Sequence, residues 1–225
     1  MSLNALQERL DVFRSAEQLL ELPLYEESGL QVGAMRPLNR LHAEEIAVVE
    51  KLTEWRNANM SSFLTQFKAT RERTKTWLRD VVLANQGQML FLVYDQNNEL
   101  IGHFGFKNLT SKTVLLDNAL RGERKGHPKL FVVAGKTLVR WLWRETTVQR
   151  IDGLVIADNI PSIMMSRQIG FKGWKRRPLI KNSTDGTVIW TIGKKGQLSP
   201  DNLHCFIVFI NRPAEFSASA NPPSQ

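Results

Sequence analysis

Cysteine is almost absent from this sequence, since Cys205 is the only one among 225 residues. An intrachain disulfide framework and a site built from several thiolates are therefore both excluded. Cys205 belongs to an apolar run, residues 205–209, which favours a small buried side chain over a nucleophile. The four histidines are scattered without the spacing of metal ligands, so we expect no metal site.

Long apolar runs are missing as well. No run approaches the length of a membrane span. Glu8, Arg9 and Asp11 interrupt the apolar positions near the N-terminus, which is unlike a signal peptide. We therefore expect a cytoplasmic protein that makes no membrane contact.

Acidic residues are the minority among the charges, with 22 Asp and Glu against 30 Lys and Arg, a net charge of +8. This excess favours an anionic ligand, such as a nucleic acid, a membrane surface or a phosphorylated small molecule, although it also serves solubility alone. We do not expect a nucleic-acid partner, because the basic residues near the C-terminus lack interleaved aromatics and a recognition helix. Those residues are Lys172, Lys175, Arg176, Arg177 and Lys181.

Helical spacing of apolar residues dominates the first third of the chain. The predicted helices are 3–20, which Pro23 is expected to end, 43–56, and 61–83, broken near residues 69–70. Thr70 is placed to cap the second half of the last helix. A short strand is predicted over residues 30–35.

Strands dominate the rest of the chain, where apolar runs alternate with turn residues. Helices are predicted over 128–144 and 161–168, the second closed by Gly170. The predicted strands are 89–94, 100–106, 113–120, 151–156, 176–181, 187–193 and 203–210. This order predicts a mixed α/β (α+β) domain with a mixed central sheet of about seven strands flanked by helices.

A pattern of four residues follows the strand at 151–156. Asn159 is followed three residues later by Ser162, and Gly170 and Phe171 stand eleven and twelve residues after it. In this pattern the chain resembles the Gcn5-related N-acetyltransferase (GNAT) superfamily. The resemblance covers about residues 30–193. It extends to a subgroup that holds RimJ/RimL-like protein N-terminal acetyltransferases and sugar-amine acetyltransferases.

The resemblance implies the GNAT fold, acetyl-CoA as the cofactor and transfer of the acetyl group to a primary amine. We expect three parts in the chain. An N-terminal amphipathic helix extension spans 1–29, the GNAT acyltransferase domain spans 30–212, and a tail rich in Ser, Ala and Pro spans 213–225 and is expected to be disordered.

The loop 121–128 is the second element of the resemblance. In the family its backbone amides hold the pyrophosphate of coenzyme A at a helix N-terminus. Gly126 matches the family pattern, whereas Glu123 and Pro128 depart from it, and the proline removes one amide. The implied cofactor-binding residues are Leu120, Arg121, Arg124, Lys125, Gly126, His127, Lys129, Asn159 and Ser162.

The catalytic groups implied by the resemblance lie mainly on the strand before this loop. The base is usually a carboxylate there, and Asp117 is the only one; His103 competes through its near-neutral pKa, and Glu123 comes third. A backbone amide within residues 119–121 is expected to polarise the thioester carbonyl. The family often uses a Tyr to meet the leaving thiolate, and Ser166 stands at that position.

Trp55, Arg56 and Asn57 are the implied acceptor-binding residues, with Arg56 contacting a phosphate or carboxylate. A packed Trp beside a helix-end Arg explains the same residues without a ligand. The expected acceptor is a small-molecule amine, an amino sugar of a nucleotide-sugar pathway. The alternatives are a protein or peptide N-terminal amine, and a degenerate GNAT domain without turnover. A homodimer is also expected, because the N-terminal helix and the strand 203–210 both need cover.

Overall fold

A computed structural model describes residues 3–216 of the chain, and the part of the predicted tail beyond residue 216 lies outside the described residues. The helices are α1 (Leu3–Ser15), α2 (Arg40–Glu44), α3 (Ile46–Ala58), α4 (Arg71–Trp77), α5 (Leu130–Glu145) and α6 (Ile160–Ile169). The strands are β1 (Leu22–Tyr25), β2 (Gln31–Pro37), β3 (Thr65–Gln66), β4 (Met89–Asp95), β5 (Leu100–Lys107), β6 (Thr113–Arg121), β7 (Arg150–Ile156), β8 (Lys172–Thr184), β9 (Thr187–Ile192) and β10 (His204–Asn211).

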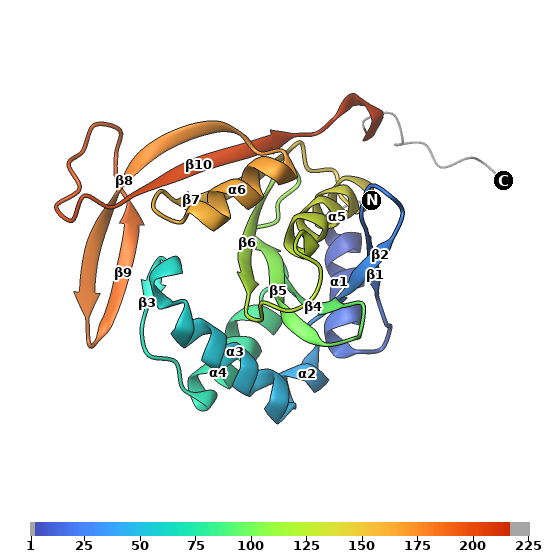
Figure 1. Cartoon of the computed structure of the whole chain (residues 1–225). Coiled ribbons are helices and arrows are strands. Elements are labelled where there is room, and N and C mark those ends of the chain that lie inside the picture. Colours follow the sequence, from blue (N-terminus) through green and yellow to red (C-terminus); the bar gives the residue numbers. More distant parts are fainter. Residues whose placement is uncertain (1–2, 217–225) are drawn as a thin grey trace.

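One continuous mixed sheet runs through the molecule in the order β1-β2-β4-β5-β6-β7-β10-β8-β9-β3 (Figure 1). The predicted fold class is confirmed, although the described sheet has ten strands rather than about seven. The added strands include β1 and β3, which the sequence pattern does not reveal. Within residues 3–216, β6 and β7 form the only parallel pair.

Helices cover the two faces of the sheet differently. Alternate residues of β4 point to opposite faces, so Phe91 joins a large core under α1 and α5, while Leu90 and Leu92 join a second core under α2 and α3. Leu10 and Phe13 of α1 belong to the first core, and β10 pairs with β7 on one side and β8 on the other. Both elements invoked for a homodimer are thus covered within the chain, and the dimer stays a prediction.

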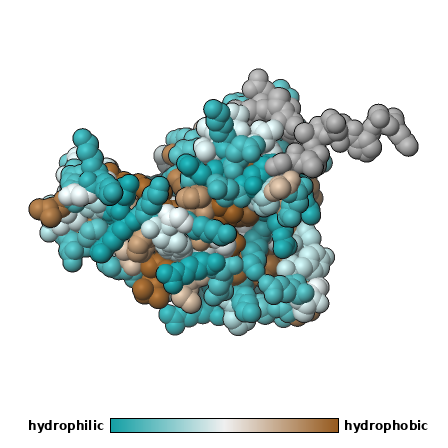
Figure 2. Space-filling view, turned by 90° about the horizontal axis from the view of Figure 1, so that it is seen from above, coloured by the Kyte–Doolittle hydropathy of each residue, from teal (hydrophilic) through white to brown (hydrophobic). Residues whose placement is uncertain are grey.

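A projecting arm formed by β8, β9 and the adjoining part of β10 swings away from the body (Figure 1). Leu179, Trp190 and Cys205 form most of its small buried core. The arm returns to the body because β9 pairs with β3, and the Trp190 amide donates to the Leu64 carbonyl at 2.7 Å. Seen from above, the surface is mostly hydrophilic, with hydrophobic side chains at the tip of the arm and across the middle (Figure 2).

The N-terminal prediction was partly wrong. The first helix ends at Ser15 rather than continuing to residue 20, because Ala16 adopts a left-handed φ of 65°. Pro23 does not end a helix but lies in β1, the edge strand of the sheet, where its missing amide is tolerated.

Two further helix predictions needed correction. The predicted helix 43–56 is two helices, because Glu45 takes an extended conformation with ψ of 114° between α2 and α3. Residues 61–70 are not helical beyond the short 3₁₀ turn Met60–Ser62, since the chain pairs there as β3. The predicted cap is confirmed: the Thr70 side chain accepts from the Arg73 amide at 3.2 Å and starts α4, which runs into the π-helical segment Leu78–Leu83.

Candidate functional site

The parallel strands β6 and β7 separate halfway along their length. Their pairing runs from Thr113 opposite Arg150 to Leu116 opposite Gly153 and stops there, although both strands continue. The edge of β6 from Asp117 onward therefore faces an opening in the sheet. A bulge at Asn118, whose φ is 53°, bends β6 at the same point. A break in strand pairing leaves backbone groups free for a ligand, so this opening is the centre of the candidate site.

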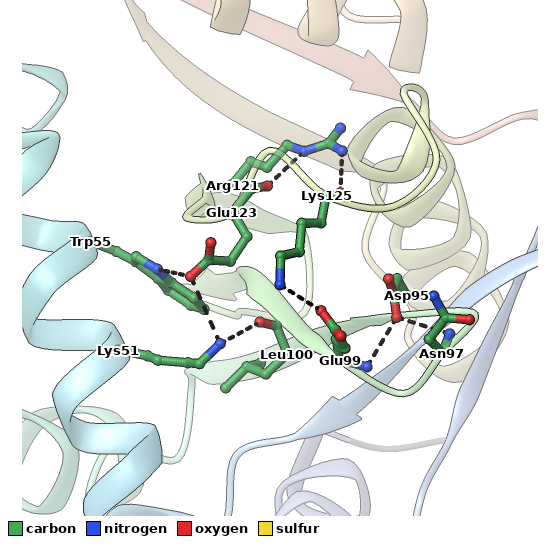
Figure 3. Close-up of polar contacts among 9 residues, drawn as sticks. All are labelled: Lys51, Trp55, Asp95, Asn97, Glu99, Leu100, Arg121, Glu123 and Lys125. Atoms are coloured by element: carbon green, nitrogen blue, oxygen red, sulfur yellow. Dashed lines mark hydrogen bonds and ion pairs between the residues drawn. The ribbon is translucent and has the colours of Figure 1, made fainter.

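The loop after β6 is anchored to the body on two sides (Figure 3). The Glu123 carboxylate accepts from Trp55 Nε1 at 3.2 Å and lies 3.8 Å from the Lys51 ammonium, both on α3. On the other side Lys125 pairs with Glu99 at 3.2 Å. The unusual residue Glu123 thus fixes the loop against α3.

Gly126 is required by the loop conformation. Its φ is 75°, and an added Cβ would lie 2.9 Å from the Asp95 Cβ. Side chains are disfavoured on both counts. The glycine of the predicted phosphate pattern therefore has a local steric reason.

The loop offers donors to an anion. The backbone amides of residues 124–127 and of Lys129 donate no hydrogen bond to another residue within 3–216, and no side chain caps α5. Arg124 and Lys129 are exposed beside them. Free amides and cations at a helix start suit the pyrophosphate of coenzyme A, so the residues present fit this cofactor. The His127 ring is turned to Glu26, 3.4 Å from its carboxylate.

Three predicted site residues gather on the face of the sheet that carries α3 and α4. Asp117 of β6 and Arg56 of α3 both act on the buried ring of His103 in β5. Burial and the positive charge of Arg73 lower the pKa of Arg56, while Asp117 opposes them. The fold thus brings together a carboxylate, an imidazole and a guanidinium that are distant in sequence.

His103 is held neutral. Its Nδ1 lies 2.7 Å from the Asn118 carbonyl oxygen, which only accepts, so Nδ1 carries the proton. Burial lowers the pKa of His103 to about 4, and the Arg56 charge acts in the same direction, against the Asn118 bond and Asp117. An imidazole this weakly basic is poorly suited to remove a proton from an amine. Its hydrogen bond to Asn118 instead stabilises the bulge.

Among the candidate bases, Asp117 is more accessible than His103, while the carboxylate of Glu123 is bound to α3. Its carboxylate pairs with Lys107 at 2.9 Å and accepts from the Asn118 side chain at 2.8 Å. The side chain is 29% exposed. An incoming ammonium can therefore reach a carboxylate that is oriented from two sides.

The three residues implied for acceptor binding have local partners. Trp55 is buried and bonded to Glu123, and the Asn57 side chain bonds both the carbonyl and the amide of Ala69. Arg56 donates to the Thr65 carbonyl at 2.8 Å and stacks on two phenylalanine rings, Phe63 and Phe67, each with its centroid at 4.4 Å. These contacts shape the segment between α3 and α4.

The residues of the predicted pattern on α6 lie across the opening. Asn159 caps α6 by accepting from the Ser162 amide at 3.1 Å, and it donates to the Ser62 hydroxyl at 3.3 Å. Gly170 ends the helix with a left-handed φ of 112°, as predicted. Ser166 is 5% exposed, on the buried face of α6. Its role toward sulfur stays a prediction.

A groove on the same side as Asp117 was missed by sequence reasoning. It is a surface hollow of about 330 Å³ over β6, β7 and β10, with the end of β9 at its side, and we call it the strand groove. Its lining includes Asn108, Leu115, Asp152, Leu154, Ile192 and Ile207. Leu115 lies two residues before Asp117, so that carboxylate lies on the same face of β6 as the groove. No local signal joins residues from four separate segments.

Other features lie away from this site. A second hollow, of about 370 Å³, is lined by residues of β2 and the β4–β5 turn and by Glu21. Cys205 is fully buried as predicted, and burial raises the pKa of its thiol to about 11. Among residues 3–216, none of the helices has the length and apolar character needed to cross a membrane. A cytoplasmic location stays a prediction.

Comparison with known families gives one match. The acetyltransferase (GNAT) domain matches residues 34–172, which include the opening, the loop and α6. Curated proteins give no match.

Solved structures share the fold at low sequence identity. The acetyltransferase from Salmonella typhimurium that modifies the N-terminal serine of ribosomal protein L7/L12 is 15% identical, with a TM-score of 0.61, covering 85% of this chain and 99% of that one. The ribosomal-protein-S5-alanine acetyltransferase from Vibrio fischeri is 15% identical, with a TM-score of 0.59 and coverages of 82% and 96%. Spermidine N-acetyltransferase from Vibrio cholerae, in complex with CoA and spermine, is 14% identical, with a TM-score of 0.55 and coverages of 79% and 94%.

Proposed function

The chain belongs to the GNAT acetyltransferase family and is an N-acetyltransferase that uses acetyl-CoA, and on that premise we propose that its acceptor is the N-terminal amine of a peptide or protein. The observation that carries this proposal is the strand groove, an open and partly apolar surface whose lining on β6 includes Leu115, two residues before Asp117. An extended peptide can lie along such a surface with its ammonium at the carboxylate.

Charge in the groove supports an ammonium acceptor. Asp152 lies on β7 directly opposite Leu115, so it and Asp117 line the same face of the separating strands. Each carboxylate has a basic partner, Arg150 for Asp152 and Lys107 for Asp117. Both pairs are partly exposed, so a positively charged amine can replace the lysine or arginine beside each carboxylate at a small cost in free energy.

Acyl transfer from a thioester to an amine needs removal of a proton from the acceptor, polarisation of the thioester carbonyl and release of coenzyme A as a thiolate, and we assign the first two to residues of this chain. Bound acetyl-CoA supplies the acetyl group as a thioester, whose C–S bond is exchanged for the C–N bond of the product amide. Asp117 accepts the proton that the acceptor ammonium must lose. The free edge of β6 beyond Leu116 offers backbone amides to the carbonyl oxygen, where negative charge develops.

The test is acetylation of matched peptides followed by mass spectrometry. Each peptide is offered with a free N-terminus and with the same N-terminus blocked, beside nucleotide-linked amino sugars. We expect the acetyl group on the α-amine of free peptides only. Acetylation of the amino sugars with all peptides left unmodified would contradict the proposal.

A nucleotide-linked amino sugar is the second candidate acceptor, and one cluster favours it. Arg56 and Arg73 stack on Phe67, and Arg56 Nε is buried without a hydrogen-bond partner in the described chain. A planar anion would suit such a cluster. Arg73→Met distinguishes the two candidates, since it should weaken a nucleotide acceptor and leave a peptide acceptor unaffected.

A further inference from the structure

Arg121, at the end of β6, turns its guanidinium back into the loop that follows it (Figure 3). Nε donates to the Glu123 carbonyl at 3.1 Å, and one terminal nitrogen donates to the Lys125 carbonyl at 2.6 Å. The other terminal nitrogen donates to the Pro128 carbonyl at 3.0 Å and the His127 carbonyl at 3.3 Å. The guanidinium of Arg121 thus donates its hydrogen bonds to the loop backbone.

These bonds fix the direction of the loop amides. In a trans peptide unit the carbonyl and the amide of the next residue point in opposite directions. Carbonyls of residues 123, 125, 127 and 128 that point at Arg121 therefore turn the amides of Arg124, Gly126 and Lys129 away from it; the unit after His127 ends in Pro128, which has no amide. Those three amides are among the five of this loop that donate no hydrogen bond within the described chain, the others being those of Lys125 and His127.

We propose that Arg121 is a positioning residue for the phosphate loop, which holds the loop amides outward for the pyrophosphate of acetyl-CoA without binding the phosphate itself. This assignment differs from direct charge contact, which the position of Arg121 in the sequence suggests. It concerns the cofactor side alone and does not depend on which amine is the acceptor.

The two unusual residues of the loop support this assignment. Pro128 removes one amide, but its carbonyl accepts from Arg121 and so directs the Lys129 amide. Glu123 is held at both ends, through its carbonyl by Arg121 and through its carboxylate by Trp55. Partial burial also lowers the pKa of Arg121, as expected for a guanidinium that is partly removed from solvent. The loop is preorganised from both sides before any ligand arrives.

The test compares Arg121→Met with Arg124→Met, which removes an equal charge from the exposed side of the same loop. Backbone NMR order parameters of residues 124–129 are measured without ligand, and acetyl-CoA affinity is measured by calorimetry. For Arg121→Met we expect lower order parameters in the loop and an affinity lower by about 10- to 100-fold. For Arg124→Met we expect unchanged order parameters and an affinity lower by about threefold.

Arg121→Lys completes the set, because a lysine keeps the charge but cannot reach several carbonyls at once. We expect its loop order parameters and affinity to lie near those of Arg121→Met, whereas a direct phosphate contact would be largely rescued. Lower affinity with unchanged order parameters, or unchanged affinity, would overturn the assignment. A wild-type protein without affinity for acetyl-CoA would overturn it together with the cofactor. If Arg121→Met does not fold, the same comparison is made with Arg121→Lys alone.

Discussion

The two sides of the opening between β6 and β7 are built in opposite ways. On the cofactor side the loop 121–129 is tied down by Arg121, Glu123 and Lys125, and its glycine admits no side chain. On the proposed acceptor side the strand groove is open, and the charged groups in it and beside it, Arg150 with Asp152 and Lys107 with Asp117, are partly exposed pairs. A fixed ligand recognised through backbone amides needs a rigid loop, whereas a variable acceptor tolerates an open surface.

The largest effect is expected at the boundary of the two sides. Asp117→Asn keeps the shape of the side chain but removes the base, so kcat should fall by about 10²- to 10⁴-fold while the Kd for acetyl-CoA is unchanged. Steady-state kinetics with a peptide acceptor checks this. Asp152→Asn is the matched control, with a loss below about tenfold. Equal losses in the two variants would place the base elsewhere.

The buried imidazole under the bulge should make stability depend on pH. Because burial lowers the pKa of His103 to about 4, the unfolded state binds more protons than the folded state between pH 6.5 and 4. Stability should therefore fall as the pH is lowered through this range, by roughly 3 kcal/mol at most. Urea unfolding at several pH values measures it, with His103→Gln as the control that loses this dependence. If the free energy of unfolding changes equally with pH in both proteins, another group causes the pH dependence.

Gly126→Val tests the rigidity of the cofactor side. The backbone strain alone costs about 1–2 kcal/mol, and the contact with Asp95 displaces the loop. We expect acetyl-CoA affinity to fall by about tenfold or more. Gly196→Val is the matched control, since Gly196 has a φ of 81° with open space around it in the loop after β9. That variant should lose similar stability and keep its affinity; affinity lost in both would attribute the effect to strain in general.

The smallest effect is expected from the anchor on α3. Trp55→Phe removes the hydrogen bond to Glu123 and should weaken acetyl-CoA binding by about fivefold, through a loss of about 1 kcal/mol. Trp190→Phe removes an indole N–H that is buried in the arm without a partner in the described chain, and its affinity should not change. Calorimetry measures both. An unchanged Kd for Trp55→Phe would mean that this anchor does not hold the loop.

Local features of the chain were predictable from the sequence. Gly170 predicted the end of α6, because a glycine in the left-handed conformation after a helix is a local signal. The cap that Asn159 provides at the start of α6 is also local. The direction of Arg121 was not predictable, since it depends on the path of a loop that the arginine itself holds. The bulge at Asn118 was not predictable either. It places the Asn118 carbonyl beside the ring of His103.

The acceptor side depends on contacts between distant segments. β3 has two residues and forms because β9 returns beside it, so no periodic pattern marks it. The strand groove likewise collects side chains from β6, β7, β9 and β10. The set of side chains that line the groove depends on how these strands lie beside one another in the fold, and a single sequence does not reveal that arrangement.

The separation of the two sides is tested most directly by placing a charge in the strand groove. Leu154→Lys puts a cation on its floor, and Leu198→Lys, at a side chain 87% exposed outside the groove, is the control. We measure KM for the peptide and Kd for acetyl-CoA in both variants. We expect a KM raised by about tenfold for Leu154→Lys with an unchanged Kd, and no change for the control. An unchanged KM, or a Kd that rises with it, would show that the strand groove does not bind the acceptor separately from the cofactor.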